Sequence, residues 1–457
     1  MLNLSQAASG IKAVAQDADV TFTSVTTDSR AITPGCLFIA LRGERFDGHA
    51  FVAEAIRQGA AAAMIDRIAA EQHRAEWQGI PLLIVADTRL GLGQLAAFWR
   101  GRQSIKLVAV TGSNGKTTVK EMLAAILREA AGQEAVLATE GNFNNDIGMP
   151  LMLLKLREQH KFAVIEMGMN HPGEIDYLTK IARPDVAVIN NAGAAHLAGL
   201  GSVEKVARAK GEIFAGLAAD GVAVINADDA FASLWKELAH GHAIIEFGLE
   251  HPAEVSATCQ LGPQDSKLKL RTPEGEFQTT LPLPGLHNVR NALAATAAAS
   301  VLGISIEAIA AGLRKFAGVK GRLQRKPGLH GAMLLDDTYN ANPASVKAAI
   351  SVLASMPGKK ILVLGDMGEL GPDASAMHGE IGVAAKQAGV DILLCHGDIC
   401  RAAAAEFGPN AWFFERIEEL LADLENLLAP DVTVLVKGSR FMQMERVVKS
   451  FEVKSEK

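Results

Sequence analysis

The chain has few cysteines and no long apolar run. Only four of its 457 residues are cysteine, Cys36, Cys259, Cys395 and Cys400, and no two form a CxxC pair. This spacing argues against a disulfide framework or a zinc site, so we interpret the four as packing residues. No segment reaches the roughly 18 consecutive apolar residues of a membrane span, and the first residues lack the regions of a signal peptide. We therefore expect a cytoplasmic protein with no membrane span.

The chain also lacks a basic block. It carries 45 basic and 51 acidic residues, for a net charge of -6, and nothing in their distribution indicates a nucleic-acid surface. Any anionic ligand must therefore be bound by local groups. Hydrophobic residues make up 49% of the chain and charged residues 21%, which is the balance of an ordinary globular protein. The length predicts about two to four domains.

The pattern of apolar runs predicts an α/β protein with three domains. Short strand-like runs around one helical stretch indicate a small α/β domain over residues 1–85. Strand-like runs such as "IKLVAV" and "DVAVIN" then alternate with amphipathic stretches, which is typical of a parallel sheet and predicts a central α/β domain over 86–317. The phosphate-binding loop described below makes this domain P-loop ATPase-like. Within it, an antiparallel patch is expected over 243–283, followed by helices over 287–302 and 305–316. The linker-like "AGVKGRLQRKPG" leads into a Rossmann-like α/β domain over 318–457.

The stretch "AVTGSNGKTTVKEM", residues 109–122, has the pattern of a phosphate-binding loop. A strand, a glycine turn and a helix start follow one another, so backbone N–H groups and the helix dipole would face an anion. Lys116 would reach the outer phosphates, and the Thr117 hydroxyl would bind Mg²⁺. The first glycine of the general motif falls on Val110, so the match is to a variant; the alternative is an ordinary turn with a helix cap. The predicted nucleotide-binding residues are Gly112, Ser113, Asn114, Gly115, Lys116, Thr117 and Thr118.

Two classes of protein use such a loop: a switch or mechanical NTPase, and an enzyme that uses ATP to form a bond. The chain has no NKxD motif, no LSGGQ-like stretch and no strand after the loop that ends in a paired Asp-Glu. One strand ends instead at Glu166, in "FAVIEMG", and another leads into a loop that carries His196, in "VAVINNAGAAHLAGLGS". The switch class therefore has little support in the sequence.

As a set, the motifs resemble those of the Mur ligases, the ATP-dependent amide-forming enzymes of peptidoglycan precursor synthesis. The resemblance covers essentially the whole chain and rests on "TTDSRAITPGCLFIALRGERFDGHAF", "TGSNGKTTVKEM", "GNFNNDIGMP", "EMGMNHPGEI", "NNAGAAHLAGLGS", "ARAKGEIF", "LPGLHNVRNALAA", "DDTYNANPAS", "LGDMGELG" and "VKGSR". It implies a UDP-sugar-binding N-terminal domain, a central ATP-binding domain and a C-terminal ligase domain. It also implies ATP and Mg²⁺ as cofactors.

The choice within the family rests on fewer residues. The DNPR motif and the D-Y-A-H-T-P strand end of the members that add diaminopimelate or lysine are absent, and "DDTYNANP" and "LGDMGELG" stand in their places. The resemblance therefore implies UDP-N-acetylmuramoyl-tripeptide and D-alanyl-D-alanine as substrates, and leaves open whether the tripeptide ends in diaminopimelate or lysine. A related member that adds a single amino acid is one alternative, and a P-loop NTPase without ligase activity is another. We expect a monomer.

The resemblance also implies the order of the chemistry. The γ-phosphoryl group of ATP moves to the carboxylate of the UDP-sugar peptide, and the amine of the dipeptide then attacks the acyl phosphate. Lys116 and Mg²⁺ would stabilise the charge on the phosphoryl oxygens. Thr117 and Glu166 would bind one Mg²⁺, and His196 and a carbamylated Lys210 a second. Without the family, His196 would be an ordinary loop residue and Lys210 a solvated charge on a helix.

Other residues of the motifs are expected to bind substrates. The resemblance assigns Asn291 to the adenine side, and arginine suits a phosphate while aspartate suits a ribose hydroxyl. Each of these residues has an ordinary alternative as a turn, cap or solvated residue. The expected residues are Asn291, Arg322 and Asp337 for ATP; Ser29, Arg30, Asn142 and Asn145 for the UDP-sugar peptide; and Tyr339, Asn340 and Asn342 for the dipeptide.

Overall fold

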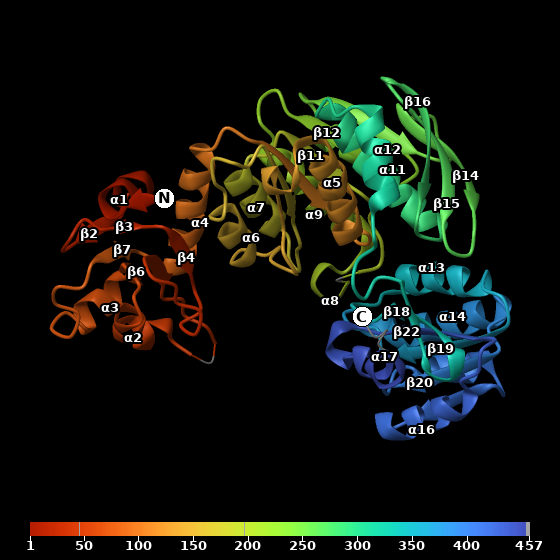
Figure 1. The fold of residues 1–457 in the computed structure, drawn as a ribbon. Helices are drawn as coiled ribbons and strands as arrows, with labels where there is room; N and C mark the ends of the chain where they lie inside the picture. The colour runs from red at the N-terminus through yellow and green to blue at the C-terminus, as the bar shows by residue number, and fades with distance from the viewer. Residues whose placement is uncertain (45, 196, 454–457) are drawn as a thin grey trace.

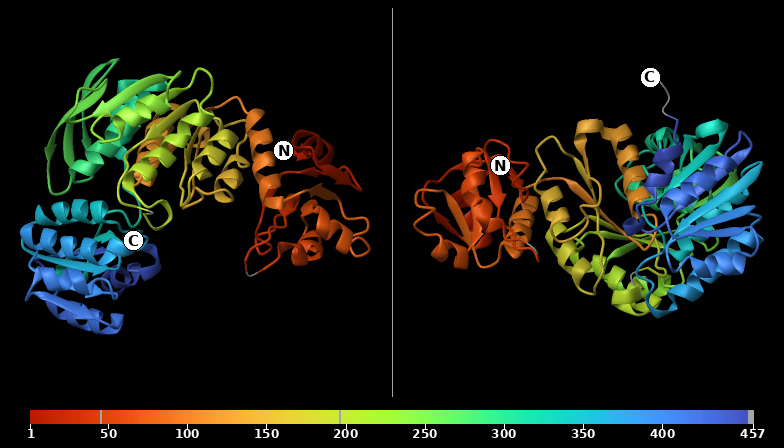
Figure 2. Two further views of the ribbon diagram at one scale, coloured as in Figure 1. Left: turned by 180° about the vertical axis from the view of Figure 1, so that it is seen from behind. Right: turned by 90° about the horizontal axis from the view of Figure 1, so that it is seen from below.

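The computed structural model describes residues 1–44, 46–195 and 197–453. Three large sheets follow one another along the chain and form an arch, with the central part at the top and the N-terminal and C-terminal parts below its two ends (Figure 1). The view from behind shows the same separation of the two end parts (Figure 2). A search of the described helices finds none that is both long and apolar enough to cross a bilayer.

The N-terminal part is a five-stranded sheet in the order β2-β7-β6-β5-β4, with β4 to β7 parallel to one another. A separate antiparallel pair consists of β1 and β3. The strands are β1 Leu2–Asn3, β2 Val14–Gln16, β3 Thr21–Phe22, β4 Ser24–Thr26, β5 Cys36–Ile39, β6 Ala62–Asp66 and β7 Leu82–Val85. The helices are α1 Leu4–Ile11, η1 Gly48–Phe51, α2 Val52–Arg57, α3 Arg67–Gln72 and α4 Thr88–Gly101, which leads into the central part.

The central part is a nine-stranded sheet in the order β16-β15-β14-β13-β12-β11-β8-β10-β9. It is parallel from β9 to β14 and antiparallel from β14 to β16. The strands are β8 Lys106–Thr111, β9 Val136–Ala138, β10 Phe162–Glu166, β11 Val186–Ile189, β12 Val222–Asn226, β13 Ala243–Gly248, β14 Val255–Leu261, β15 Ser266–Thr272 and β16 Gly275–Leu281. The helices are α5 Lys116–Ala131, η2 Gln133–Ala135, α6 Gly148–Leu153, α7 Glu174–Ala182, α8 Leu197–Leu200, α9 Val203–Gly211, η3 Glu212–Gly216, α10 Ala232–Leu238, α11 Leu286–Val301 and α12 Ile306–Lys315.

Strand β8 is buried on both faces because helices cover the central sheet on both sides. Leu107 and Ala109 belong to the apolar core that includes residues of α4, α6 and α7, whereas Val108 and Val110 belong to the core that includes residues of α5, α11 and α12. A strand with two buried faces appears in the sequence as a continuous apolar run, as "LVAV" does at residues 107–110. The phosphate loop therefore begins from the rigid centre of the molecule.

The C-terminal part is a six-stranded sheet in the order β17-β18-β22-β19-β20-β21, parallel except for the edge strand β17. The strands are β17 Gln324–Pro327, β18 Met333–Asp337, β19 Lys359–Gly365, β20 Ile392–His396, β21 Ala411–Phe414 and β22 Val432–Lys437. The helices are η4 Leu329–Gly331, α13 Pro343–Ala354, η5 Gly371–Asp373, α14 Ala374–Gln387, α15 Arg401–Phe407, α16 Ile417–Leu427, η6 Arg440–Met442 and α17 Glu445–Phe451.

The α/β fold expected from the sequence is confirmed, and so are the two helices over 286–301 and 306–315. The antiparallel patch expected over 243–283 is confirmed for β14 to β16, whereas β13 is parallel to both of its neighbours. The boundaries at residues 85 and 317 stay predictions. Two further expectations differ from the structure. Part of the predicted linker forms β17, because Gln324–Pro327 pairs with β18. Cys259 lies exposed on β14 and packs into no core, whereas the other three cysteines are buried.

Helix α12 lies against α5, the helix of the phosphate loop, and Gly312 makes this close approach possible. A Cβ added at Gly312 would overlap the backbone of Ile126. We expect Gly312→Ala to lower the free energy of unfolding by about 1–3 kcal/mol, because the two helices must separate. Gly101→Ala, where an added Cβ meets nothing within 4 Å among the described residues, should not lower it. Urea denaturation of both variants tests this, and equal midpoints would contradict the prediction.

Candidate functional site

The phosphate loop joins the end of β8 to the start of α5. Gly115 caps α5 in the left-handed region, at φ +78°, and a Cβ at this position would overlap the side chains of Asn291 and Asn190. Gly115 is thus required for two reasons: its backbone angle favours glycine, and there is no room for a side chain. The Lys116 ammonium folds back and donates to the Gly112 carbonyl at 2.7 Å. Lys116 therefore lies over the loop, where a phosphate would accept its hydrogen bond.

Glu166 ends β10 beside the first turn of α5. The Thr117 hydroxyl donates to Glu166 Oε2 at 2.9 Å, and Asn144 Nδ2 donates to Oε1 at 2.8 Å. The Glu166 N–H in turn donates to the Thr139 hydroxyl at 2.9 Å, and Glu166 is only 3% exposed. A hydroxyl and a carboxylate at this spacing are the hard oxygen ligands that Mg²⁺ prefers.

Two asparagines after β11 hold the phosphate loop, and they were not predicted as site residues. Asn190 Nδ2 donates to the Asn114 carbonyl at 2.9 Å and to Asn291 Oδ1 at 2.8 Å. Asn191 Oδ1 accepts from the Asn114 N–H at 2.8 Å, and its amide donates back to the Asn114 carbonyl at 3.0 Å. The only signal in the sequence was the quoted "NNAG" after a strand, a pattern that also fits an ordinary turn.

Lys210 lies on α9 and is buried, with 1% of its surface exposed. Burial lowers the pKa of its amine well below the usual range, and the Lys116 cation adds to this effect. Burial also lowers the pKa of Lys116. The Glu166 carboxylate opposes this shift, and the Arg322 cation adds to it. Lys210 therefore does not lie in the solvated environment in which a lysine on a helix is normally charged.

The C-terminal part reaches the phosphate loop through β18 and the residues that follow it. Asn342 Nδ2 donates to Asn114 Oδ1 at 2.8 Å, while Asn342 Oδ1 caps α13. Arg322 stacks its guanidinium over the Tyr339 ring at 4.2 Å. Both sides of the predicted ATP site are thus in contact in this conformation.

Asp337 is 6% exposed, and its carboxylate already has two partners. It pairs with the Lys437 ammonium at 2.6 Å and accepts from the Leu323 N–H at 3.2 Å. Lys437, which is 1% exposed, also donates to the Asn340 carbonyl at 2.9 Å. The pair therefore ties β18 to β22 and to the segment that carries Arg322. Lys437 belongs to the quoted motif "VKGSR" but was not predicted to be a site residue.

A cavity of about 1880 Å³ is lined by residues of the phosphate loop, of the start of α4 and of the C-terminal part. It contains most of the predicted residues. Those that line it are Ser113, Asn114, Gly115, Lys116, Thr117, Asn142, Asn145, Glu166, Arg322, Tyr339, Asn340 and Asn342. Those that lie outside its lining are Ser29, Arg30, Gly112, Thr118, Lys210, Asn291 and Asp337. His196, predicted as a metal ligand, lies outside the described residues.

Ser29 and Arg30 lie in the N-terminal part after β4, away from the cavity. Arg30 is exposed and forms a 2.9 Å ion pair with Asp28, an arrangement that leaves the Arg30 side chain at the surface. Asn145 lines the cavity, but its Oδ1 accepts from the Gly148 N–H at 2.8 Å at the start of α6. Its side chain therefore holds the loop that also carries Asn144.

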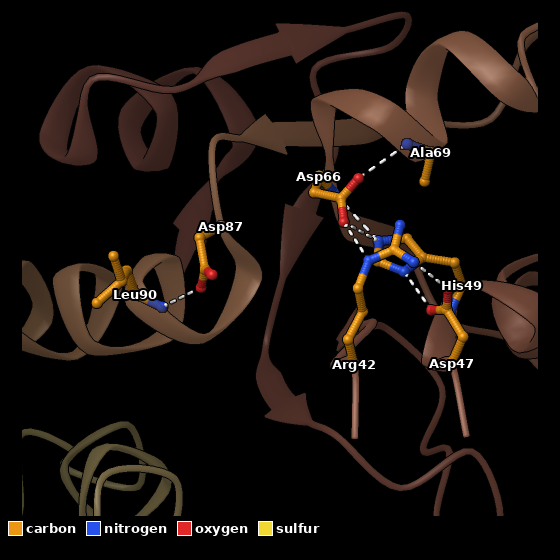
Figure 3. Close-up of polar contacts among 7 residues, drawn as sticks. All are labelled: Arg42, Asp47, His49, Asp66, Ala69, Asp87 and Leu90. Atoms are coloured by element: carbon orange, nitrogen blue, oxygen red, sulfur yellow. Dashed lines mark hydrogen bonds and ion pairs between the residues drawn. The ribbon is translucent and has the colours of Figure 1, made fainter. Parts of the chain in front are cut away.

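The quoted stretch "LRGERFDGHAF" builds a second polar cluster, in the N-terminal part (Figure 3). Arg42 pairs with both Asp47 and Asp66, and His49 Nδ1 lies 2.6 Å from Asp47 Oδ1. The Asp66 N–H donates to His49 Nε2, and Asp66 Oδ1 accepts from the Ala69 N–H. Because Nε2 accepts, the His49 proton lies on Nδ1 and faces Asp47. The cluster joins Arg42, which follows β5, to the start of η1 and to the end of β6.

The motif "LGDMGELG" forms a loop that touches the central part. Asp366 accepts from the Cys400 N–H at 2.8 Å, and His378 Nε2 accepts from the Met367 N–H at 2.9 Å. The side chains of Asp366, His378 and Cys400 come close enough to suggest a metal site. Asp366 and His378 accept from backbone amides, however, and the Cys400 thiol donates to the Leu364 carbonyl. They hold the loop so that the Glu369 carbonyl accepts from the Ala198 N–H of α8 at 3.1 Å.

The site therefore combines a phosphate loop, a cation, a buried carboxylate beside a hydroxyl, and a facing domain. This combination defines a P-loop enzyme that binds a nucleoside triphosphate between two domains. Family profiles described as "Mur ligase family, catalytic domain", "Mur ligase middle domain" and "Mur ligase, glutamate ligase domain" match residues 21–100, 110–299 and 321–440. The chain belongs to the Mur ligase family, and its relatives in that family are ATP-dependent amide ligases.

Individual relatives show which members of the family the chain is similar to. The UDP-N-acetylmuramoyl-tripeptide–D-alanyl-D-alanine ligase of Escherichia coli is 43% identical over 99% of this chain and 98% of its own length. The solved UDP-N-acetylmuramoylalanyl-D-glutamyl-2,6-diaminopimelate–D-alanyl-D-alanyl ligase of Acinetobacter baumannii is 39% identical, with a TM-score of 0.87 over 98% of both chains. The MurF ligase of Thermotoga maritima, solved in complex with ADP, is 28% identical, with a TM-score of 0.82 over 94% of this chain and 97% of that one.

His287, near the start of α11, yields a prediction about pH. Burial lowers the pKa of its imidazole from 6.5 to about 4, with Lys437 and Arg290 adding to this effect and Asp337 opposing it. Because the folded state resists protonation, the unfolded state binds the extra proton between these two values, and stability should fall as the pH falls from 6.5 to 4.

We expect His287→Asn to lose less stability between pH 7 and pH 5 than the unchanged protein does. Denaturant titrations at both pH values measure the difference. The exposed His330 supplies the control, because His330→Asn should keep the acid sensitivity. The explanation is wrong if His287→Asn and the unchanged protein lose stability equally.

Proposed function

We propose that this chain joins D-alanyl-D-alanine to UDP-N-acetylmuramoyl-tripeptide at the expense of ATP. The full-length likeness to ligases of this activity supports the substrates. The observation that carries the chemistry is the contact of Glu166 with Thr117 at the phosphate loop. A free carboxylate is a poor electrophile, so it must first receive a phosphoryl group, and this loop is where ATP would supply it.

Lys116 is assigned to the β- and γ-phosphates, since its ammonium lies at the mouth of the loop and already donates to an oxygen there. The backbone N–H groups at the start of α5 face the same space. Arg322 approaches from the C-terminal part and is assigned to phosphate, with Asn291 and Asp337 assigned to the nucleoside. Together these groups would hold the phosphates of ATP near the substrate carboxylate, and positioning supplies most of the catalysis of phosphoryl transfer.

One Mg²⁺ is assigned to Thr117 and Glu166, and a second to His196 and the carbamate of Lys210. The two described ligand atoms are hard oxygens 2.9 Å apart, which fits this ion. When bound, Mg²⁺ would neutralise charge on the phosphoryl oxygens. Asn144 keeps the carboxylate oriented by donating to the oxygen that Thr117 does not use.

Lys210 is assigned a carbamate. Only a neutral amine attacks carbon dioxide, and burial favours the neutral amine of Lys210. The reaction joins the Nζ lone pair to the carbon of carbon dioxide and releases one proton from Nζ. The product is an anion that can bind a metal. Because Lys210 is only 1% exposed, its burial would shield the carbamate from hydrolysis.

The UDP-sugar peptide and the dipeptide are assigned to different walls of the cavity. Asn142 and Asn145 line its central wall and are assigned to the sugar and peptide, with Ser29 and Arg30 assigned to the uridine diphosphate on the N-terminal part. The dipeptide is assigned to the C-terminal wall. Tyr339, Asn340 and Asn342 lie there, next to the phosphate loop.

Phosphate release from ATP tests the proposed function. It should require both UDP-N-acetylmuramoyl-tripeptide and D-alanyl-D-alanine, and a free amino acid should not replace the dipeptide. We expect Glu166→Gln to lower kcat at least about 100-fold, because a neutral amide replaces the carboxylate assigned to Mg²⁺. Glu204→Gln on α9, an exposed residue paired with Arg208, is the control. Release with ATP alone would identify a simple NTPase instead.

The carbamate has its own test. Lys210→Ala should lose activity and regain part of it when a short carboxylic acid is added, because the acid can occupy the cavity left by the carbamate. Lys205→Ala on the same helix should remain active without the acid. In addition, ¹³C-labelled bicarbonate should give a carbamate signal in the unchanged protein that Lys210→Ala lacks. Full activity of Lys210→Ala would refute the proposal.

A further inference from the structure

A polar cluster on the cavity wall has no part in the proposed phosphoryl transfer. It consists of Asp87, Arg89, Asp146 and Tyr177, and we name it the junction cluster because α4 meets the central part there. All four residues line the same cavity as the phosphate loop, and Leu90 lies beside them. The cluster is therefore reached from the space assigned to the UDP-sugar peptide.

Arg89 and Asp146 form the centre of the junction cluster. Arg89 donates from Nε and Nη2 to the two oxygens of Asp146, the Nη2 contact being 2.8 Å. Tyr177 on α7 reaches the pair by passing over α4 at Gly93, where an added Cβ would overlap its hydroxyl. Burial raises the pKa of Tyr177, and the Asp146 carboxylate adds to this effect. The ring therefore stays a neutral wall of the cluster.

The junction cluster keeps binding capacity toward the cavity. A guanidinium has five N–H donors, and Asp146 uses only the Nε and Nη2 edge of Arg89, whose side chain is 55% exposed. Asp87 caps α4 by accepting the Leu90 N–H at 2.9 Å through Oδ1 (Figure 3), and its second oxygen has no partner among the described residues. Leu90 is 54% exposed and offers an apolar surface between them. These groups are complementary to a ligand side chain that is apolar in the middle and carries both an ammonium and a carboxylate at its end.

The cluster lies close to the carboxylate that reacts. Asn144 donates to Glu166, and Asp146 is two residues further on, so their Cα atoms are at most about 7.6 Å apart. The reacting carboxylate belongs to the third residue of the tripeptide, and that residue's own side chain leaves the adjacent carbon. Glu166 and Arg89 line the same cavity, so a side chain of several methylenes would extend from the reacting carboxylate toward Arg89.

We propose that the junction cluster binds the side chain of the third residue of the tripeptide and selects one that ends in both an ammonium and a carboxylate. Arg89 binds the carboxylate, Asp87 binds the ammonium, and Leu90 contacts the methylenes. The inference rests on the proposed function and deepens it: 2,6-diaminopimelate has both groups, whereas lysine has the ammonium alone. The enzyme therefore prefers the diaminopimelate tripeptide.

The test measures KM and kcat of the full-length protein for two tripeptides, one ending in diaminopimelate and one in lysine. Arg89→Gln should raise KM for the diaminopimelate substrate about 10-fold or more, because a charge-assisted hydrogen bond is lost. KM for the lysine substrate should change less than about 2-fold. Asp87→Asn, which keeps the helix cap, should raise KM for both substrates, since both carry the ammonium.

Two control variants distinguish substrate binding by Arg89 from a purely structural role of the Arg89–Asp146 pair. Asp146→Asn removes the ion pair but leaves Arg89, so it should keep the preference for diaminopimelate. Arg57→Gln removes an exposed ion pair on α2, away from the cavity, and should leave both KM values unchanged. If Arg89→Gln and Asp146→Asn weaken both substrates equally, the pair is only a structural clamp and the inference is wrong. If the unchanged protein uses neither tripeptide, the proposed function itself fails.

Discussion

The site depends on the Glu166 carboxylate being held by groups from two other segments of the chain. Thr117 comes from the helix after β8, Asn144 comes from the loop before α6, and both donate to this one side chain. The geometry follows from the sheet, because β8, β10 and β11 are parallel neighbours. Their carboxyl ends meet at one edge, which is where ligands bind in open α/β sheets. Without this register, the loop would have a lysine but no carboxylate opposite it.

Residues whose role is fixed by neighbours in sequence could be predicted well. Gly115, Lys116 and Thr117 lie where the strand, turn and helix pattern requires them, because local backbone geometry alone builds a phosphate loop. Glu166 was predicted as the end of an apolar strand. The helices after residue 285 were also predicted within about two residues, since their periodicity is strong.

Residues that act across the fold could not be predicted in the same way. Asn191 meets Asn114 from another strand end, and Asn342 meets Asn114 from another domain. The Asp337 and Lys437 pair joins two strands of the C-terminal sheet that are neighbours only in space. In a single sequence each of these residues fits a turn, a cap or a solvated charge, and only the tertiary structure decides between the possibilities.

The contacts that hold the loop come from amides rather than from ions, and this has an electrostatic consequence. Asn190, Asn191 and Asn342 fix the Asn114 backbone and side chain while carrying no net charge. Carboxylates in their places would cancel the field of Lys116, which a phosphate needs. The acidic group near the loop is Glu166, on the side assigned to the metal. The carbamate proposed for Lys210 fits this division, because a buried cation next to Lys116 would be repelled, whereas burial favours the neutral amine of Lys210.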